Sequence, residues 1–364
     1  PKDSSNKISP RIEAKLARRK TINQTGAWSG MFESEAIFEK RKSNYGFVWN
    51  WYKPTGSLNS FKLTHLEWHY HEKKWEWLGK PYPPQFLRTS VPYSYSAFEE
   101  HTQRYWNDLT SQELSKAILN NWAVQTDGAS SDGVFFDFWH NKHPTHFNET
   151  VVRNARKDIA KEFRNQFGDQ FIIAGNVNWE KDVDTISYLN GVFLELFKDD
   201  GYRVYNSRKK KKIENLLEYY EKNLQHPKLI ALEGWRATAS LNDKDRNTPE
   251  NRKMAKLLTA MSVVLPTNGY ILYADNNQDT PNYDHAHLNY DFYSFDIGKP
   301  TGPRVKVSNG VSYKQHQEGF IAYNITSRAK SFEINGSNRT VSIEAKSGLF
   351  CKETGDAFDC LAVD

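Results

Sequence analysis

The chain repeats a pattern in which a short apolar segment ends on an acidic residue. The pattern occurs at residues 132–137, 190–195, 229–233 and 268–275. Runs this short and this rich in β-branched and aromatic residues predict strands that are buried on both faces. Stretches of helical periodicity separate these segments, which indicates a parallel sheet with helices between the strands.

Extending the same criteria along the chain predicts eight strands and a (β/α)8 barrel of the α/β class over residues 26–296. In such a barrel the C-terminal strand ends meet at one mouth, where the chemistry lies. Residues 1–25 are polar and basic, and we expect them to form a flexible arm. The expected strands are residues 45–51, 63–68, 86–91, 132–139, 171–176, 191–197, 228–233 and 269–275, and the expected helices are residues 111–125, 149–167, 209–224 and 249–265.

After residue 296 the pattern changes to short alternating segments separated by turn residues. Asn309-Gly310 and Asn335-Gly336 are two such turns. Alternation with Asn-Gly turns is typical of hairpins, so residues 297–364 are expected to form a small antiparallel β region.

Length and composition fit this organisation. A chain of 364 residues can hold a barrel of roughly 250 residues and a smaller appendage. The net charge of +5 mildly favours anionic partners but is too small and dispersed to indicate nucleic-acid binding. The basic run at residues 208–212 opens a helical stretch and has its simplest explanation as a solvated helix face. No apolar stretch of about 18 residues occurs, so we expect no membrane span.

The two cysteines, Cys351 and Cys360, lie in the C-terminal region. They could close a hairpin with a disulfide in an oxidising compartment, or remain free thiols. Glycosylation triplets fit an extracellular protein, although they also arise by chance; they begin at Asn23, Asn148, Asn324, Asn335 and Asn338. The sequence opens on Pro1 without a signal-type segment, so we expect a processed or trimmed form.

The acidic strand ends are the candidates for catalysis. Cleavage of a glycosidic bond needs one carboxylic acid and one carboxylate, and Asp137 and Glu195 are the leading pair. Glu233 is the second choice, because its place at the end of the seventh strand matches a common nucleophile position in barrel glycosidases. The alternative for each is an ion pair with an Arg or Lys beneath a loop.

Polar and aromatic residues cluster just beyond the strand ends. Trp stacks on pyranose faces, while Asn and His bind hydroxyl groups, although any one of these residues could instead be structural. Asp275 is followed by Asn276, Asn277, Gln278 and Asp279, which could also form a hydrogen-bonded loop or a weak cation site. The candidate substrate-binding residues are Trp49, Trp51, Trp139, His140, Asn176, Trp179, Trp235, Tyr273 and Asp275.

Three segments also resemble a known family: residues 132–139, residues 190–195, and the late stretch 296–300 with 318–324. Across residues 45–330 the chain is similar to the hypothetical glycosyl hydrolases, a group distantly similar to endo-α-1,4-polygalactosaminidases. The resemblance implies a (β/α)8 barrel with acidic catalytic residues at Asp137 and Glu195. The N-terminal arm and residues 65–77 have no counterpart that we can place in that family.

The sequence therefore predicts a glycoside hydrolase acting on an oligo- or polysaccharide, either neutral, anionic or amino-substituted, with no cofactor. One alternative is a carbohydrate-binding or structural barrel without turnover. Another is a metal-dependent hydrolase or deacetylase, for which the histidines at 140, 143, 146, 285 and 287 would be candidates although their spacing has no familiar ligand pattern. The sugar, the linkage and the oligomeric state stay open.

Overall fold

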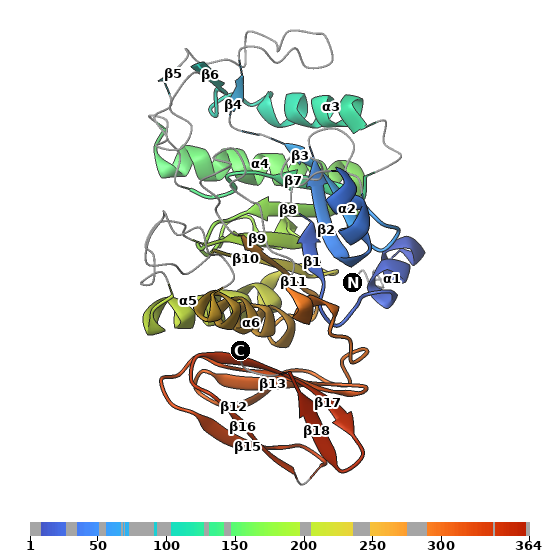
Figure 1. Cartoon of the computed structure of the whole chain (residues 1–364). Helices are drawn as coiled ribbons and strands as arrows, with labels where there is room; N and C mark the ends of the chain where they lie inside the picture. Colours follow the sequence, from blue (N-terminus) through green and yellow to red (C-terminus); the bar gives the residue numbers. More distant parts are fainter. Residues whose placement is uncertain are drawn as a thin grey trace, which may run out of the picture.

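A computed structural model describes the chain at residues 9–26, 35–50, 56–66, 68, 70–72, 91–92, 103–126, 131–141, 147–196, 205–235, 248–274, 290–337 and 339–361. Figure 1 shows a barrel with helices around it and a separate sheet formed by the last part of the chain.

The core is a closed barrel of eight parallel strands, which confirms the predicted fold. Its strand order is β1-β11-β10-β9-β8-β7-β3-β2. Every neighbouring pair in this order is parallel. The barrel strands are β1 (Gln24–Gly26), β2 (Tyr45–Asn50), β3 (Phe61–Leu66), β7 (Gly133–Phe136), β8 (Ile172–Asn176), β9 (Gly191–Glu195), β10 (Leu229–Trp235) and β11 (Gly269–Ala274).

The strands expected at 45–51 and 63–68 are confirmed as β2 and β3, but the sequence-based assignment missed the first strand of the barrel. Residues 9–26, assigned mostly to a flexible arm, form helix α1 (Pro10–Ala17) and the first strand β1. The expected third strand at 86–91 lies outside the described residues except for Val91, which pairs in a three-stranded antiparallel sheet outside the barrel. That sheet consists of β4 (Tyr70–Glu72), β5 (Val91–Pro92) and β6 (Gln103–Trp106).

Side chains alternate strictly between the inside and the outside of the barrel. On β8, Ile172 and Ala174 belong to the interior cluster, while Ile173 packs outward against the helices. On β7, Phe135 is interior and Val134 is exterior. This period of two follows from the pleat of a strand, and it determines which polar residue at each strand end faces the barrel axis.

Helix α1 covers the base of the barrel, the end opposite the mouth. Ile12 belongs to the interior cluster and Leu16 packs against it. Lys15 Nζ donates to Asp132 Oδ2 at 2.5 Å and to the Ser60 carbonyl at 2.6 Å. The helix therefore fills the base with apolar side chains and is fixed there by a buried ion pair.

The other helices pack around the outside of the barrel, and several begin at a capping side chain. Asn148, Asn206 and Thr248 each accept a hydrogen bond from the backbone N–H three residues later, which stabilises a helix N-terminus. The α-helices are α2 (Glu35–Arg41), α3 (Leu114–Thr126), α4 (Glu149–Phe167), α5 (Ser207–Asn223) and α6 (Pro249–Val264), and the 3-10 turns are η1 (Lys42–Asn44), η3 (Ile186–Tyr188) and η5 (Asp291–Ser294).

The C-terminal part of the chain forms the predicted antiparallel region. A five-stranded sheet has the order β12-β13-β14-β17-β18, beside a two-stranded sheet of β15 and β16. It lies against α6, and Lys256 Nζ on that helix donates to the Leu361 carbonyl at 3.0 Å (Figure 1). The strands are β12 (Val305–Ser308), β13 (Val311–His316), β14 (Gly319–Asn324), β15 (Lys330–Ile334), β16 (Arg339–Ile343), β17 (Ser347–Thr354) and β18 (Ala357–Cys360).

Cys351 and Cys360 face each other across β17 and β18 and are bonded, with an S–S distance of 1.97 Å. Of the two alternatives that the sequence left open, the structure shows the disulfide. One glycosylation triplet is excluded in the folded chain, because the Asn324 side chain is buried and donates to the backbone carbonyls of Arg328 and Glu344. Among the described helices, none has the length and apolar character needed to span a membrane.

Candidate active site

Four polar residues occupy the inward positions at the ends of four consecutive strands. Asp137 directly follows β7, Asn176 ends β8, Glu195 ends β9, and Glu233 lies near the end of β10. Each continues the alternation of the interior side chains below it, which are Phe135, Ala174, Phe193 and Ala231. The barrel therefore brings three candidate acids and one amide to a single end, where barrel enzymes carry their chemistry.

Asn176 links the two leading carboxylates. Its Nδ2 donates to Asp137 Oδ1 at 3.0 Å and to Glu195 Oε2 at 2.8 Å. Since both bonds start at one nitrogen, the two oxygens lie no farther apart than the combined bond lengths, 5.8 Å. The two N–H bonds of an amide diverge by roughly 120°, which places the oxygens about 5 Å apart.

The orientation of the Asn176 amide is set by its other side. Asn176 Oδ1 accepts a hydrogen bond from the Asn178 backbone N–H at 3.1 Å. A flipped amide would direct its oxygen at two carboxylates and its NH₂ group at an N–H donor. The Asn176 nitrogen therefore faces the two carboxylates, because only this orientation pairs every donor with an acceptor.

The backbone beyond Asp137 and Asn176 adopts an uncommon conformation at both strand ends. Phe138 has φ 47° and Asn178 has φ 53°, in the left-handed region that a bulky residue such as Phe rarely occupies. The turn at Phe138 directs its N–H to Asp137 Oδ1 at 2.9 Å. Local strain of this kind concentrates at functional sites, and here it gives the Asp137 carboxylate a second N–H donor.

A buried arginine fixes the loops that carry these two residues. Arg156 Nη1 on α4 donates to the Trp139 carbonyl at 3.1 Å and lies 3.3 Å from Asp182 Oδ2. Burial lowers the pKa of Arg156, and the negative charges of Asp182 and Asp184 oppose that shift. Trp139 Nε1 donates to Thr185 Oγ1 at 2.8 Å. The loops after β7 and β8 are thus joined beneath the mouth.

Glu233 is completely buried beside Glu195, and the two residues are paired across β9 and β10. Tyr205 lies within electrostatic range of it. Burial raises the pKa of the Tyr205 hydroxyl, a hydrogen bond from the Trp235 N–H at 2.6 Å opposes the shift, and the charge of Glu233 adds to it. Tyr205 is therefore a neutral phenol at physiological pH, on the side of the site that holds the third acid.

His65 is a site residue that the sequence did not identify. It continues the inward face of β3 after Phe61 and Leu63, and its ring centroid lies 5.8 Å from that of Phe135. Burial lowers the pKa of His65 to about 4, with the charge of Asp137 opposing the shift. A neutral imidazole therefore lies near Asp137. The alternation of side chains along β3 could have identified His65 from the sequence, because it places this polar residue on the inward face of the strand.

Several of the aromatic candidates lie away from the mouth of the barrel. Trp49 lies inside the barrel, stacked on Phe135 at 4.6 Å. Trp139 is 0% exposed and packs on Phe136 and Trp68 in the layer between strands and helices.

Two more of these candidates belong to that same outer layer. Tyr273 donates from its hydroxyl to Asn251 Oδ1 on α6 at 2.9 Å. Trp179 lies beneath Lys212 Nζ, which is 4.6 Å from its ring centroid. The structure therefore does not bring Trp139, Tyr273 or Trp179 to the barrel interior. Trp235 is buried two residues after Glu233, at a position that the alternation along β10 directs inward.

Two side chains next to Asp137 remain near the site. His140 is buried, and its ring centroid lies 5.9 Å from that of Phe138. Phe138 is partly exposed, which makes it the aromatic residue of this loop that a ligand could contact. It was not among the sequence-based candidates, because the adjacent Trp139 was the more obvious stacking residue.

Some candidates lie outside the described residues, namely Trp51, Asp275 and the histidines at 143, 146, 285 and 287. Within the described ranges, no group of three His, Cys, Asp or Glu side chains is arranged to hold a metal ion.

Neither a family model nor a curated protein sequence matches the chain. Solved structures with a similar chain trace include a noncanonic maltogenic α-amylase from Thermotoga neapolitana, with 12% identity, a TM-score of 0.48 and coverage of 95% of this chain and 98% of that one. An Anoxybacillus α-amylase has 13% identity and a TM-score of 0.49, covering 86% and 87%. The glycoside hydrolase domain of PelA from Pseudomonas aeruginosa has 11% identity and a TM-score of 0.46, covering 73% and 97%. Identities this low, with TM-scores under one half, concern the course of the chain and carry no argument about its chemistry.

Proposed function

We propose that this protein is a glycoside hydrolase that cleaves an oligo- or polysaccharide with Asp137 and Glu195. The observation that carries the proposal is the Asn176 amide, which donates to both carboxylates at 3.0 and 2.8 Å and so holds them on the two sides of one small space.

The separation supports a retaining mechanism. Carboxyl groups about 5 to 5.5 Å apart are typical of retaining glycosidases, whereas inverting enzymes keep them about 6.5 to 9.5 Å apart to admit a water molecule. The separation of about 5 Å inferred from the amide bridge matches the first class. One carboxylate then attacks the anomeric carbon directly.

The hydrogen bonds favour Asp137 as the nucleophile. Asp137 Oδ1 accepts from both the Phe138 N–H at 2.9 Å and Asn176 Nδ2, and two N–H donors stabilise an ionised carboxylate. Asp137 would form a bond to the anomeric carbon as Glu195 gives its proton to the departing glycosidic oxygen. Glu195 would then take a proton from the water that displaces Asp137, which restores both groups. Glu233, paired with Glu195 across β9 and β10, is the second candidate for an acid-base role.

The test is a screen for release of reducing ends from a panel of neutral, amino and acidic polysaccharides. Wild type is compared with Asp137→Asn, Glu195→Gln and the control Glu333→Gln, an exposed acid on β15. On a polysaccharide that the wild type cleaves, we expect both site variants to lose about 10²- to 10⁴-fold in turnover, and the control to remain active.

Thermal shift measured on the same panel separates binding from turnover. A site variant with wild-type turnover would remove that residue from the mechanism. Ligand binding by the wild type without cleavage of any polysaccharide would contradict the enzymatic proposal and favour a carbohydrate-binding barrel.

A further inference from the structure

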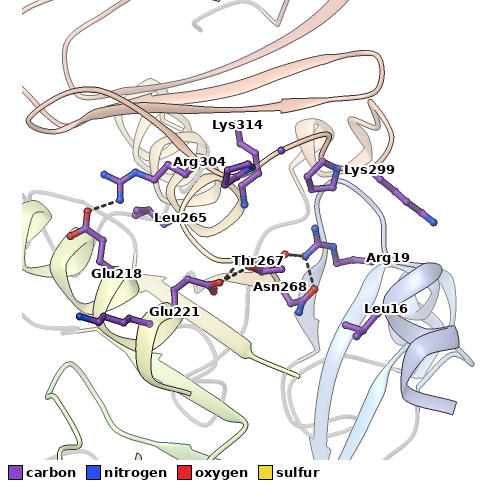
Figure 2. Close-up of a pocket in the computed structure, with 14 residues that line it drawn as sticks. Leu16, Arg19, Glu218, Glu221, Leu265, Thr267, Asn268, Lys299, Arg304 and Lys314 are labelled. Carbon is purple, nitrogen blue, oxygen red and sulfur yellow. Dashed lines mark hydrogen bonds and ion pairs between the residues drawn. The ribbon is translucent and has the colours of Figure 1, made fainter. Parts of the chain in front are cut away.

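A cavity away from the mouth lies where the base of the barrel meets the C-terminal sheet. Its volume is about 570 Å³. Leu16 and Arg19 contribute from the α1 side, Thr267 and Asn268 from the turn before β11, and Lys314 from β13 (Figure 2). The turn before β11 leads into the N-terminal end of that strand, so this cavity and the carboxylates lie at opposite ends of the barrel.

The cavity has an excess of positive charge. Five of its lining residues are cationic and two are acidic. Both acids already have partners: Glu218 Oε1 lies 2.5 Å from Arg304 Nη1, and Glu221 accepts the Thr267 N–H at 2.9 Å. The cations are Arg19, Lys222, Lys299, Arg304 and Lys314.

Lys314 shows that this charge is poorly compensated. Its ammonium group is buried and donates to the carbonyls of Val263 at 2.8 Å and Pro266 at 2.6 Å. Burial, together with the positive charges of Arg19 and Arg304, lowers the pKa of Lys314 to about 7, and the charge of Glu221 opposes the shift. A buried cation near other cations is stabilised by an added negative charge.

The walls combine this charge with apolar surface. Leu16, Leu265, Pro300 and Pro303 line the same cavity. Small-molecule sites have volumes of about 300 to 1,000 Å³ and join apolar walls to a few charged groups. A bare inorganic anion would satisfy the cations but would leave the apolar walls uncovered.

We infer that this cavity binds an anionic sugar, a pyranose that carries a carboxylate, sulfate or phosphate group. The acidic group lies against Arg19, Arg304 and Lys314, and the ring contacts the leucines and prolines. The inference does not depend on the proposed hydrolase activity, because none of the candidate catalytic residues lines this cavity.

Titration calorimetry on the full chain tests the ligand class. The probes are glucuronate, glucose 6-sulfate, glucose 6-phosphate, glucose and inorganic phosphate. We expect saturable binding of at least one charged sugar, weakened by added salt, weaker binding of inorganic phosphate, and no binding of glucose. Binding of glucose as tight as that of the charged sugars, or binding of no charged sugar, would overturn the inference. If inorganic phosphate bound as tightly as glucose 6-phosphate, the sugar ring would contribute nothing to binding, and the inference of a sugar ligand would be wrong.

Gly302 allows a matched pair of variants to locate the site. It lines the cavity, and a Cβ atom placed there meets no atom within 4 Å. Gly302→Asp and Gly302→Asn have nearly the same shape and differ by one negative charge. A unit charge several ångströms from the ligand weakens anion binding by about three- to tenfold, so Asp should weaken it by this factor relative to Asn. Equal affinity in the two variants would place the binding elsewhere.

Charge removal at the rim gives a second comparison. The double variant Lys222→Gln/Lys299→Gln removes two exposed cations that line the cavity. Lys306→Gln/Lys330→Gln removes two exposed cations on β12 and β15, outside the lining. We expect the first to weaken binding by about three- to tenfold and the second by less than about twofold. An equal loss in both would mean that only net charge matters, and would contradict a defined site. Asp137→Asn should leave binding unchanged, which separates this test from that of the hydrolase proposal.

Discussion

The Asn176 bridge gives a prediction with a worked magnitude. Replacing Asn176 with Leu keeps a similar side-chain volume and removes both N–H donors. Each hydrogen bond to a charged group contributes about 1.5–3 kcal/mol, and each 1.4 kcal/mol is about a factor of ten in rate. If both bonds persist in the transition state, Asn176→Leu lowers kcat/KM by about 10²- to 10⁴-fold.

The same variant should change the pH dependence. The Asn176 N–H donor stabilises the ionised form of the Asp137 carboxylate. Without this donor, Asp137 binds a proton more readily, and the acidic limb of the pH–activity profile moves to higher pH. This shift distinguishes a positioning role from a general loss of folded protein, which lowers activity at every pH alike.

A matched control exists on the outside of the barrel. Asn251 on α6 is also a buried amide, and its Oδ1 accepts the Tyr273 hydroxyl at 2.9 Å. Asn251→Leu should lower stability, measured by urea unfolding, and leave kcat and the pH profile of the remaining folded enzyme unchanged. An Asn176→Leu variant with the wild-type pH profile and kcat/KM would refute the argument that the amide holds the pair.

Three further predictions concern the barrel itself. Asp132→Asn leaves the buried Lys15 ammonium group without its carboxylate partner, so we expect a loss of about 3–5 kcal/mol in the free energy of unfolding. A loss below about 1 kcal/mol would contradict the conclusion that this ion pair fixes α1 at the base of the barrel. Gly133→Ala places a Cβ atom 1.9 Å from the Ile172 carbonyl oxygen and should prevent stable folding, whereas Gly302→Ala should melt like the wild type in the same calorimetric scan. Burial lowers the pKa of His65 to about 4, and the charge of Asp137 opposes the shift. Between about pH 6.5 and 4 the unfolded chain therefore binds a proton that the folded chain does not, and the free energy of unfolding falls as the pH drops through this window. His65→Gln should remove up to about 3 kcal/mol of that loss, and an unchanged pH dependence of urea unfolding would contradict the burial of a neutral imidazole.

The sequence was most informative where the hydrophobic pattern and the barrel topology together determine which face a residue occupies. The apolar runs before Asp137 and Glu195 predict strands, and the period of two then places both acids on the inner face of a closed barrel. Seven of the eight barrel strands, β2, β3 and the five from β7 onward, coincide at least in part with strands predicted from such runs. The C-terminal hairpins and the disulfide were equally accessible, because local turn signals and a short separation determine them.

Other features could not be seen without the structure, for physical reasons. Strand β1 has only three residues, Gln24, Thr25 and Gly26, and such a short polar segment produces no hydrophobic signal. Trp139 turns into the core because the backbone at Phe138 has φ 47°, a conformation that the residue type disfavours. The role of Asn176 as a bridge depends on the distance between neighbouring strands, and no single strand carries that information.

The central claim is that Asp137 is a nucleophile held about 5 Å from Glu195. It is tested most directly with an activated 2-fluoro glycoside of the sugar that the reducing-end screen identifies, followed by mass spectrometry of the intact protein and its peptides. We predict one covalent glycosyl group on Asp137, slow recovery of activity as it hydrolyses, and no labelling of Asp137→Asn. Labelling of Glu195 or Glu233 instead, or turnover that inverts the anomeric centre without any covalent adduct, would contradict the account.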